Sequence, residues 1–140
     1  MSAQDLEFTH KLADAADKIS MARFGAIDLK IETKPDLTPV SDADKSVEEE
    51  LRKLIGKYSS TDSIIGEEFG HDGGGNREWI LDPIDGTKNF VRGVPFWGTL
   101  IGLRVDGVMT TGMVSAPALG RRWFGAKGLG SFLQTNTNSI

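Results

Sequence analysis

The densest group of residues capable of chemistry lies at positions 82–87, where the sequence reads Asp-Pro-Ile-Asp-Gly-Thr. Two carboxylates, Asp82 and Asp85, flank a proline that restricts the backbone. Gly86 permits an unusual backbone angle, and its amide and that of Thr87 can face an anion if Thr87 begins a helix. Carboxylates for cations beside amides for a phosphate favour metal-assisted phosphoryl chemistry. Short Asp-x-x-Asp strings are equally common as proline turns with a capping Asp, so this segment alone leaves both interpretations open.

Three other parts of the chain carry charged residues that could serve the same site. Glu67 and Glu68 follow an apolar run, and adjacent residues of a strand point to opposite faces, so at most one of them readily joins Asp82. Asp44 lies at the start of an expected helix, where capping and the helix dipole already explain an acid. Lys34 is a surface lysine unless an anion lies near it. Taken singly, all of these residues are explained as caps or solvated charges.

The composition excludes several other kinds of site and partner. The absence of cysteine excludes disulfides, thiolate zinc sites and cysteine nucleophiles, and two histidines are too few for a His-rich metal site. Metal chemistry must therefore rest on carboxylates, which favours Mg²⁺, Mn²⁺ or Ca²⁺. A formal net charge of −4 with scattered basic residues gives no footprint for nucleic acid or an anionic membrane. Without a membrane-length apolar run or a signal-peptide pattern, we expect a soluble cytoplasmic protein.

The periodicity of apolar residues predicts two helices in the first part of the chain. The first covers residues 6–24 and is ended by Gly25. Alternation over 27–32 predicts a half-buried strand, and the two prolines of 33–42 are expected to hold that segment extended. The second helix has Ser41 as its N-cap. Its apolar stripe consists of Val47, Leu51, Leu54, Ile55 and Tyr58.

The rest of the chain has the signals of strands and tight turns. Asp106-Gly107 between two apolar runs is a strong hairpin signal, and the two flanking runs read as central strands. A flexible loop is expected at 71–76. The predicted strands are 63–68, 78–81, 97–105, 108–116, 121–128 and 130–134. Helices followed by mostly antiparallel strands predict a single layered α+β domain. Residues 130–140 read as an unfinished strand-turn-strand unit.

The whole series of motifs resembles the inositol monophosphatase superfamily. The resemblance rests on Gly-Glu-Glu at 66–68, on WILDPIDGTKNF at 79–90 and on the G-x-P-F run at 93–96, and it extends over nearly the full chain. It implies a layered α/β sandwich of the inositol-monophosphatase/fructose-1,6-bisphosphatase type. It also implies a phosphatase that is usually homodimeric, uses two or three Mg²⁺ ions with Mn²⁺ as an alternative, and is often inhibited by lithium.

The resemblance implies a metal-ligand role for four residues. Glu67 matches the family's bridging ligand, which also helps to activate the attacking water. Asp82 matches the carboxylate shared between two metals, and Ile84 matches the residue whose backbone carbonyl binds the first. Asp85 matches a ligand of the second metal.

The resemblance implies roles in phosphate and water binding for five more positions. Gly86 and Thr87 match the phosphate-binding amides, and the Thr87 hydroxyl orients the attacking water. Asp44 matches the acid that hydrogen-bonds this threonine. Lys34 matches a lysine near the outer metal, and Glu68 resembles an acid just behind the ligands.

One departure from the family pattern is large. The family has a third signature in its C-terminal half whose Asp completes the second metal site, and no acidic residue follows Asp106 here. We therefore expect residues 1–140 to be the N-terminal metal- and phosphate-binding portion of the phosphatase domain, with the C-terminal half absent. On this interpretation the chain alone is inactive and prone to associate.

The finer resemblance concerns the substrate. Lys88 and Arg92, together with the runs at 33–44 and 114–126, resemble the histidinol-phosphate phosphatases of actinobacterial type. This implies a small phosphorylated metabolite, L-histidinol phosphate of histidine biosynthesis, as the substrate. The alternatives within the family are an inositol-1-phosphate phosphatase and a nucleotide 3′-phosphatase. A non-catalytic fragment that binds a metal and a phosphate is the alternative from another class, and a purely structural role for every acid is the simplest one.

Overall fold

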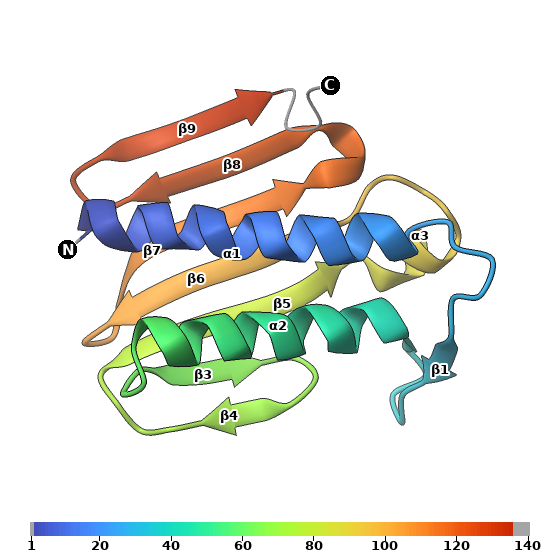
Figure 1. Ribbon diagram of the computed structural model, residues 1–140, viewed down its shortest axis with the longest axis horizontal. Helices are drawn as coiled ribbons and strands as arrows, with labels where there is room; N and C mark the ends of the chain where they lie inside the picture. Colours follow the sequence, from blue (N-terminus) through green and yellow to red (C-terminus); the bar gives the residue numbers. More distant parts are fainter. Residues whose placement is uncertain (1, 136–140) are drawn as a thin grey trace.

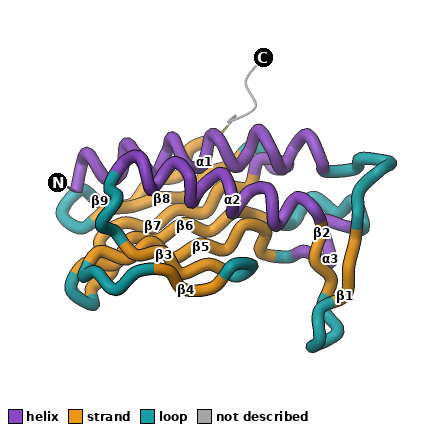
Figure 2. Tube along the Cα trace, turned by 60° about the horizontal axis from the view of Figure 1, so that its bottom comes forward, coloured by secondary structure: helices purple, strands orange, loops and turns teal. Residues whose placement is uncertain are grey.

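The computed structural model describes residues 2–135 as a seven-stranded sheet with two long helices on one face (Figures 1 and 2). The helices are α1 (Ser2–Arg23) and α2 (Asp42–Tyr58). The strands of the sheet are β3 (Ser63–Gly66), β4 (Gly70–Asp72), β5 (Arg77–Asp85), β6 (Gly98–Val105), β7 (Val108–Ala116), β8 (Arg121–Ala126) and β9 (Gly130–Thr135). Their order is β4-β3-β5-β6-β7-β8-β9, and β3 and β5 form the one parallel pair among the described strands. The predicted α+β class with a mostly antiparallel sheet is confirmed.

Both predicted helices are present, and their ends follow from local signals. Gly25 adopts a φ of +75° just beyond α1, which ends the helix as expected. Ser41 is the N-cap of α2, and its side chain and that of Asp44 bond reciprocally to each other's backbone as a capping box. The predicted stripe of α2 faces the sheet, and Val47, Leu51 and Ile55 are fully buried.

The core lies between these two helices and the sheet. Trp79 of β5 and Leu103 of β6 are fully buried there, beside the apolar residues of α1 and α2. A second, smaller cluster lies at the end of the sheet where β5 terminates. It consists of Ala43, Ile84, Phe90 and Trp97. The smaller cluster therefore supports the segment that carries the Asp82–Thr87 motif.

The predicted strand over 27–32 is wrong. Ile27 is fully exposed, and the strand present is β1 (Ile31–Thr33), whose three residues are all exposed. It pairs with β2 (Pro39–Ser41) as a separate two-stranded hairpin. The chain folds back at Leu37, where φ is +70°, so the segment between the prolines is a turn and not an extended run. Alternation predicts burial only where a second layer covers the strand; β1 is exposed along its length, whereas Val40 and Ser41 of its partner β2 are buried.

Two predictions next to the site also need correction. The strand expected to reach residue 68 ends at Gly66, so Glu67 and Glu68 lie in a turn. The loop expected at 71–76 begins as strand β4, because His71 and Asp72 pair with Ile65 and Ile64. Only residues 67–69 connect β3 to β4, which is a suitable length for a β-hairpin. The glycines at 73–75 led to the prediction of a loop for the whole of 71–76.

Strand β5 is longer than predicted and runs through the motif to Asp85. Proline lacks the amide that an inner strand needs, and the pairing register between β5 and β6 shifts between Asp82 and Asp85 to accommodate Pro83. The first four residues of the Asp82–Thr87 motif therefore belong to the distorted end of β5, beyond the predicted strand end at residue 81.

The second half of the sheet matches the prediction. Asp106 and Gly107 have φ angles of +51° and +80°, as a two-residue type I′ hairpin turn requires. Strands β6 and β7 are central in the sheet, and β8 and β9 complete it. The part of the predicted terminal unit beyond Thr135 lies outside the described residues. Among the described helices, none is long and apolar enough to cross a membrane.

Candidate active site

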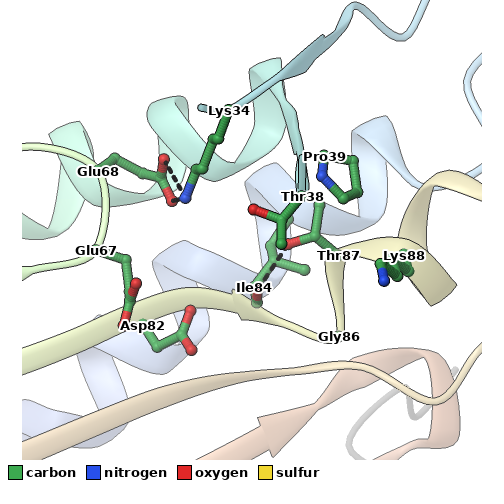
Figure 3. Close-up of a pocket in the computed structure, with 10 residues that line it drawn as sticks. All are labelled: Lys34, Thr38, Pro39, Glu67, Glu68, Asp82, Ile84, Gly86, Thr87 and Lys88. Atoms are coloured by element: carbon green, nitrogen blue, oxygen red, sulfur yellow. Dashed lines mark hydrogen bonds and ion pairs between the residues drawn. The ribbon is translucent and has the colours of Figure 1, made fainter. Parts of the chain in front are cut away.

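A pocket of about 310 Å³ opens where β5 ends, between the β1–β2 hairpin and the turn after β3 (Figure 3). Its lining comes from three separate segments: the hairpin, the turn, and the stretch from the end of β5 into the start of α3 (Thr87–Val91). The lining residues are Lys34, Thr38, Pro39, Glu67, Glu68, Asp82, Ile84, Gly86, Thr87 and Lys88. The fold thus brings together positions that are more than 50 residues apart in the sequence.

Most of the residues predicted for the site line this pocket. Of nine such residues, seven are part of the lining, and the exceptions are Asp44 and Asp85. Asp44 lies just behind the pocket, where it contacts a lining residue through a hydrogen bond. Asp85 lies on the other side of the strand end, in a second hollow lined also by Phe96 and Trp97.

The carboxyl groups of Glu67 and Asp82 point into the same part of the pocket (Figure 3). Burial raises the pKa of Asp82 to about 7, and the neighbouring carboxylates of Glu67, Asp85, Asp44 and Glu68 add to the increase. Negative charges gathered this closely repel one another. A cation placed between them would relieve that repulsion.

Thr87 connects the floor of the pocket to helix α2. Its hydroxyl lies 3.0 Å from Asp44 Oδ1 and 3.0 Å from the backbone carbonyl oxygen of Ile84, and it can donate a hydrogen bond to either oxygen. The other oxygen of Asp44, Oδ2, accepts from the amide and hydroxyl of Ser41 at 2.8 and 2.6 Å. Asp44 therefore serves as a helix cap and as a support for Thr87 at once, two roles that appeared as alternatives in the sequence.

Lys34 reaches the pocket from the β1–β2 hairpin and pairs with Glu68 at 3.3 Å (Figure 3). Partial burial opposes the charge of Lys34, but the carboxylates of Glu68, Asp44 and Glu67 outweigh it, and the pKa of the ammonium lies above its ordinary value. Burial raises the pKa of Glu68, and the positive charge of Lys34 only partly offsets this. The pair joins the exposed hairpin to the turn that carries Glu67.

Gly86 could not be replaced without a change in the backbone. Its φ is +89°, and a Cβ at this position would lie 3.1 Å from the carbonyl oxygen of Phe96. Glycine here lets the chain turn sharply from β5 into α3. Asp82 and Asp85 line different hollows, but the carboxylate of Asp85 still contributes to the raised pKa of Asp82.

The donor set of the pocket fits a hard cation such as Mg²⁺. The carboxylates of Glu67 and Asp82 and the carbonyl of Ile84 are oxygen ligands, which such ions prefer. Within residues 2–135, no group of three or more Asp, Glu, His or Cys side chains stands gathered as a finished metal site. The pocket therefore offers an incomplete oxygen cluster with an excess of negative charge, and any ion would take further ligands from water or substrate.

Two buried residues that support the site were missed in the sequence. Glu48 of α2 accepts the amides of Glu68 and Phe69, and Thr99 of β6 donates to the carbonyl of Pro83 at 2.8 Å. An acid on the apolar stripe of α2 is a signal that could have identified Glu48. Nothing local distinguishes Thr99, because its partner is 16 residues away.

The comparisons with known proteins agree with this arrangement. The sequence profile of the inositol monophosphatase family matches residues 1–139. The histidinol-phosphatase of Mycobacterium tuberculosis is 56% identical over 133 residues, which are 94% of this chain and 51% of the relative. The histidinol-phosphatase of Streptomyces coelicolor is also 56% identical, over 91% of this chain and 50% of the relative.

The structural neighbours agree as well. A solved inositol monophosphatase (IMPase) from Thermotoga maritima superposes with a TM-score of 0.87 at 32% identity, covering 94% of this chain and 51% of that one. The chain thus spans about half the length of the relatives that it matches. With the sequence profile, the two relatives and the fold in agreement, the chain belongs to the inositol monophosphatase family.

Proposed function

We propose that residues 1–140 form the N-terminal portion of a Mg²⁺-dependent phosphomonoesterase and supply its cation and phosphate sites. One observation carries the proposal: Asp82 lies in a pocket with Glu67, and burial together with the surrounding carboxylates raises its pKa to about 7. Strongly shifted pKa values in a pocket are typical of functional sites. Family membership supports the same conclusion.

Each residue of the pocket has a proposed role. Glu67, Asp82 and the carbonyl of Ile84 would hold a first cation, and Asp82 and Asp85 would share in a second. Mg²⁺ bound there would supply positive charge that neutralises the phosphate oxygens and favours in-line attack.

The remaining groups act on water and phosphate. The Thr87 hydroxyl, held by Asp44 at 3.0 Å, would orient a water molecule, and Glu67 would accept its proton. The amides of Gly86 and Thr87 would bind the phosphate oxygens. Lys34 and Glu68 would adjust the charge at the rim of the pocket.

We propose L-histidinol phosphate as the substrate. The two relatives with 56% identity are named histidinol-phosphatases. Lys88, one of the two positions that set the motif apart from typical inositol monophosphatases, lines the pocket, and Arg92 follows α3 as an exposed residue.

Cation binding can be tested on the chain itself. We expect MgCl₂ or MnCl₂ to raise the midpoint of thermal unfolding of the wild type, because an ion that binds only the folded state stabilises it. Asp82→Asn removes a charge from a crowded site, so it should raise the midpoint without the ion and abolish the response to it. Asp106→Asn, in the exposed hairpin turn, is the matched control and should respond like the wild type. An unchanged ion response in Asp82→Asn would remove the basis for the metal assignment.

Turnover requires a longer protein. We expect the chain alone to release no phosphate, because no acid follows Asp106 to complete the second cation site. Joined to the C-terminal half of the Mycobacterium tuberculosis relative, it should hydrolyse histidinol phosphate in the presence of Mg²⁺. Faster turnover of inositol 1-phosphate or adenosine 3′,5′-bisphosphate would overturn the substrate proposal and leave the phosphatase proposal intact. A homodimer in the longer form and a cytoplasmic location stay predictions.

A further inference from the structure

Glu48 is a fully buried carboxylate beside the apolar residues Val47 and Leu51 of α2. Its two oxygens accept backbone amides from the turn after β3: Oε1 lies 2.8 Å from the amide of Glu68, and Oε2 lies 2.9 Å from the amide of Phe69. A buried charge is costly unless it is fully hydrogen-bonded. The turn amides and one cation provide those bonds.

Arg52 provides that cation from the next turn of α2. Its Nε lies 2.9 Å from Glu48 Oε2, and a terminal nitrogen donates to the carbonyl of Gly70. The turn between β3 and β4 is therefore held by α2 at three successive residues, 68–70. The contact leaves no room at Gly66, where a Cβ would lie 2.3 Å from Glu48 Oε2. The close packing of α2 against the end of β3 therefore requires glycine at position 66.

We propose that Glu48 is a positioning residue that holds Glu67 in place opposite Asp82; the inference rests on the proposed cation site. Glu67 precedes the two clamped amides directly, so its backbone position is set by Glu48. Asp44 lies four residues earlier on α2, about 6 Å along the helix, and supports Thr87. One rigid helix thus aligns both halves of the pocket, the turn with Glu67 and the strand end with Thr87.

The test uses Glu48→Gln in the 140-residue chain, with Mn²⁺ alone as the probe. A Gln amide nitrogen cannot accept a hydrogen bond, so one turn amide loses its partner while the size of the side chain is kept. We expect the Mn²⁺ affinity, measured by calorimetry, to fall about tenfold, since residues that orient metal ligands typically have effects of this order. The amides of Glu68 and Phe69 should lose protection in hydrogen-exchange NMR. Glu49→Gln, at the exposed neighbouring position, is the matched control and should change neither.

A second variant keeps the proposal testable if Glu48→Gln does not fold. Gly66→Ala keeps the charge of Glu48 and forces its carboxylate to move, so it should reproduce both effects. If Glu48→Gln fails to fold, Gly66→Ala decides alone. Lost protection of the amides with unchanged Mn²⁺ affinity, in either variant, would overturn the proposal and leave Glu48 with a structural role only. If the wild type binds no Mn²⁺, the proposed function fails, and amide protection then decides only whether Glu48 orders the turn.

Discussion

At the residue scale, single side chains in this protein join elements that the sequence separates widely. Asp44 divides its two oxygens between the cap of α2 and Thr87, and Glu48 divides its own between two turn amides. Tyr58 is the corresponding residue at the far end of α2. Its hydroxyl donates to Asp5 of α1 at 2.8 Å, and its ring stacks on Phe8. The hydrogen bonds among these contacts are directional and partly or fully shielded from water.

The Tyr58 contact predicts a pH dependence of stability. Burial, together with the hydrogen bond to Asp5, raises the pKa of Tyr58 from about 10 to about 12. The neutral phenol is thus favoured in the folded state, and its contribution is complete below pH 10 and lost as the pH rises towards 12. We expect the stability advantage of the wild type over Tyr58→Phe, from urea unfolding, to shrink over this range. Tyr58 is the only tyrosine, so tyrosinate absorbance reports its titration directly. A constant difference across the range would contradict the assignment.

At the element scale, α1 is attached to the second half of the sheet by a buried ionic cluster. Arg122 of β8 lies 2.8 Å from Asp17 of α1 and 3.2 Å from the hydroxyl of Ser115 on β7. Arg122→Met should lower the free energy of unfolding by about 3 kcal/mol, because the partly buried Asp17 carboxylate loses its only cationic partner among the described residues and keeps only the hydroxyl of Ser115. Arg121→Met changes the exposed neighbour on the same strand and should cost less than about 0.5 kcal/mol. Equal effects in urea unfolding would show that the cluster does not anchor α1.

At the scale of the whole molecule, the sheet has one covered and one open face. Four apolar residues are directly opposite one another on β6 to β9: Leu100, Val114, Trp123 and Leu133. Their neighbours Ile101 and Met113 belong to the core under α1 and α2, so this row lies on the other face of the sheet. Val114, Trp123 and Leu133 are 36%, 41% and 51% exposed. An apolar row of this kind on a sheet favours association.

The open face predicts self-association of the 140-residue chain. Sedimentation velocity should show a weight-average mass that increases with concentration, and Trp123→Lys should reduce this increase because it places a charge in the middle of the row. Ile27→Lys makes the same change on the exposed segment before the hairpin and should leave the association unaltered. If both variants associate like the wild type, the row is not the contact surface.

The sequence alone determined those features that depend on neighbouring residues. The cap of α2 at Ser41, the hairpin at Asp106-Gly107 and the end of α1 at Gly25 follow from interactions within a few positions, and all three were predicted. Seven residues of the pocket were also predicted, but through the resemblance of the whole series of motifs to a family, because each motif taken singly had a structural explanation.

Only the tertiary structure decided which charges face one another. The parallel pairing of β3 with β5 and the burial of Glu48 beneath the turn depend on contacts between distant segments. Strand β1 shows the same limit, since the alternating pattern at 27–32 suits a half-buried strand but all three residues of β1 are exposed. Local patterns record which face of an element is apolar. They do not record what packs against that face, because packing energy arises between elements and is absent from any single one.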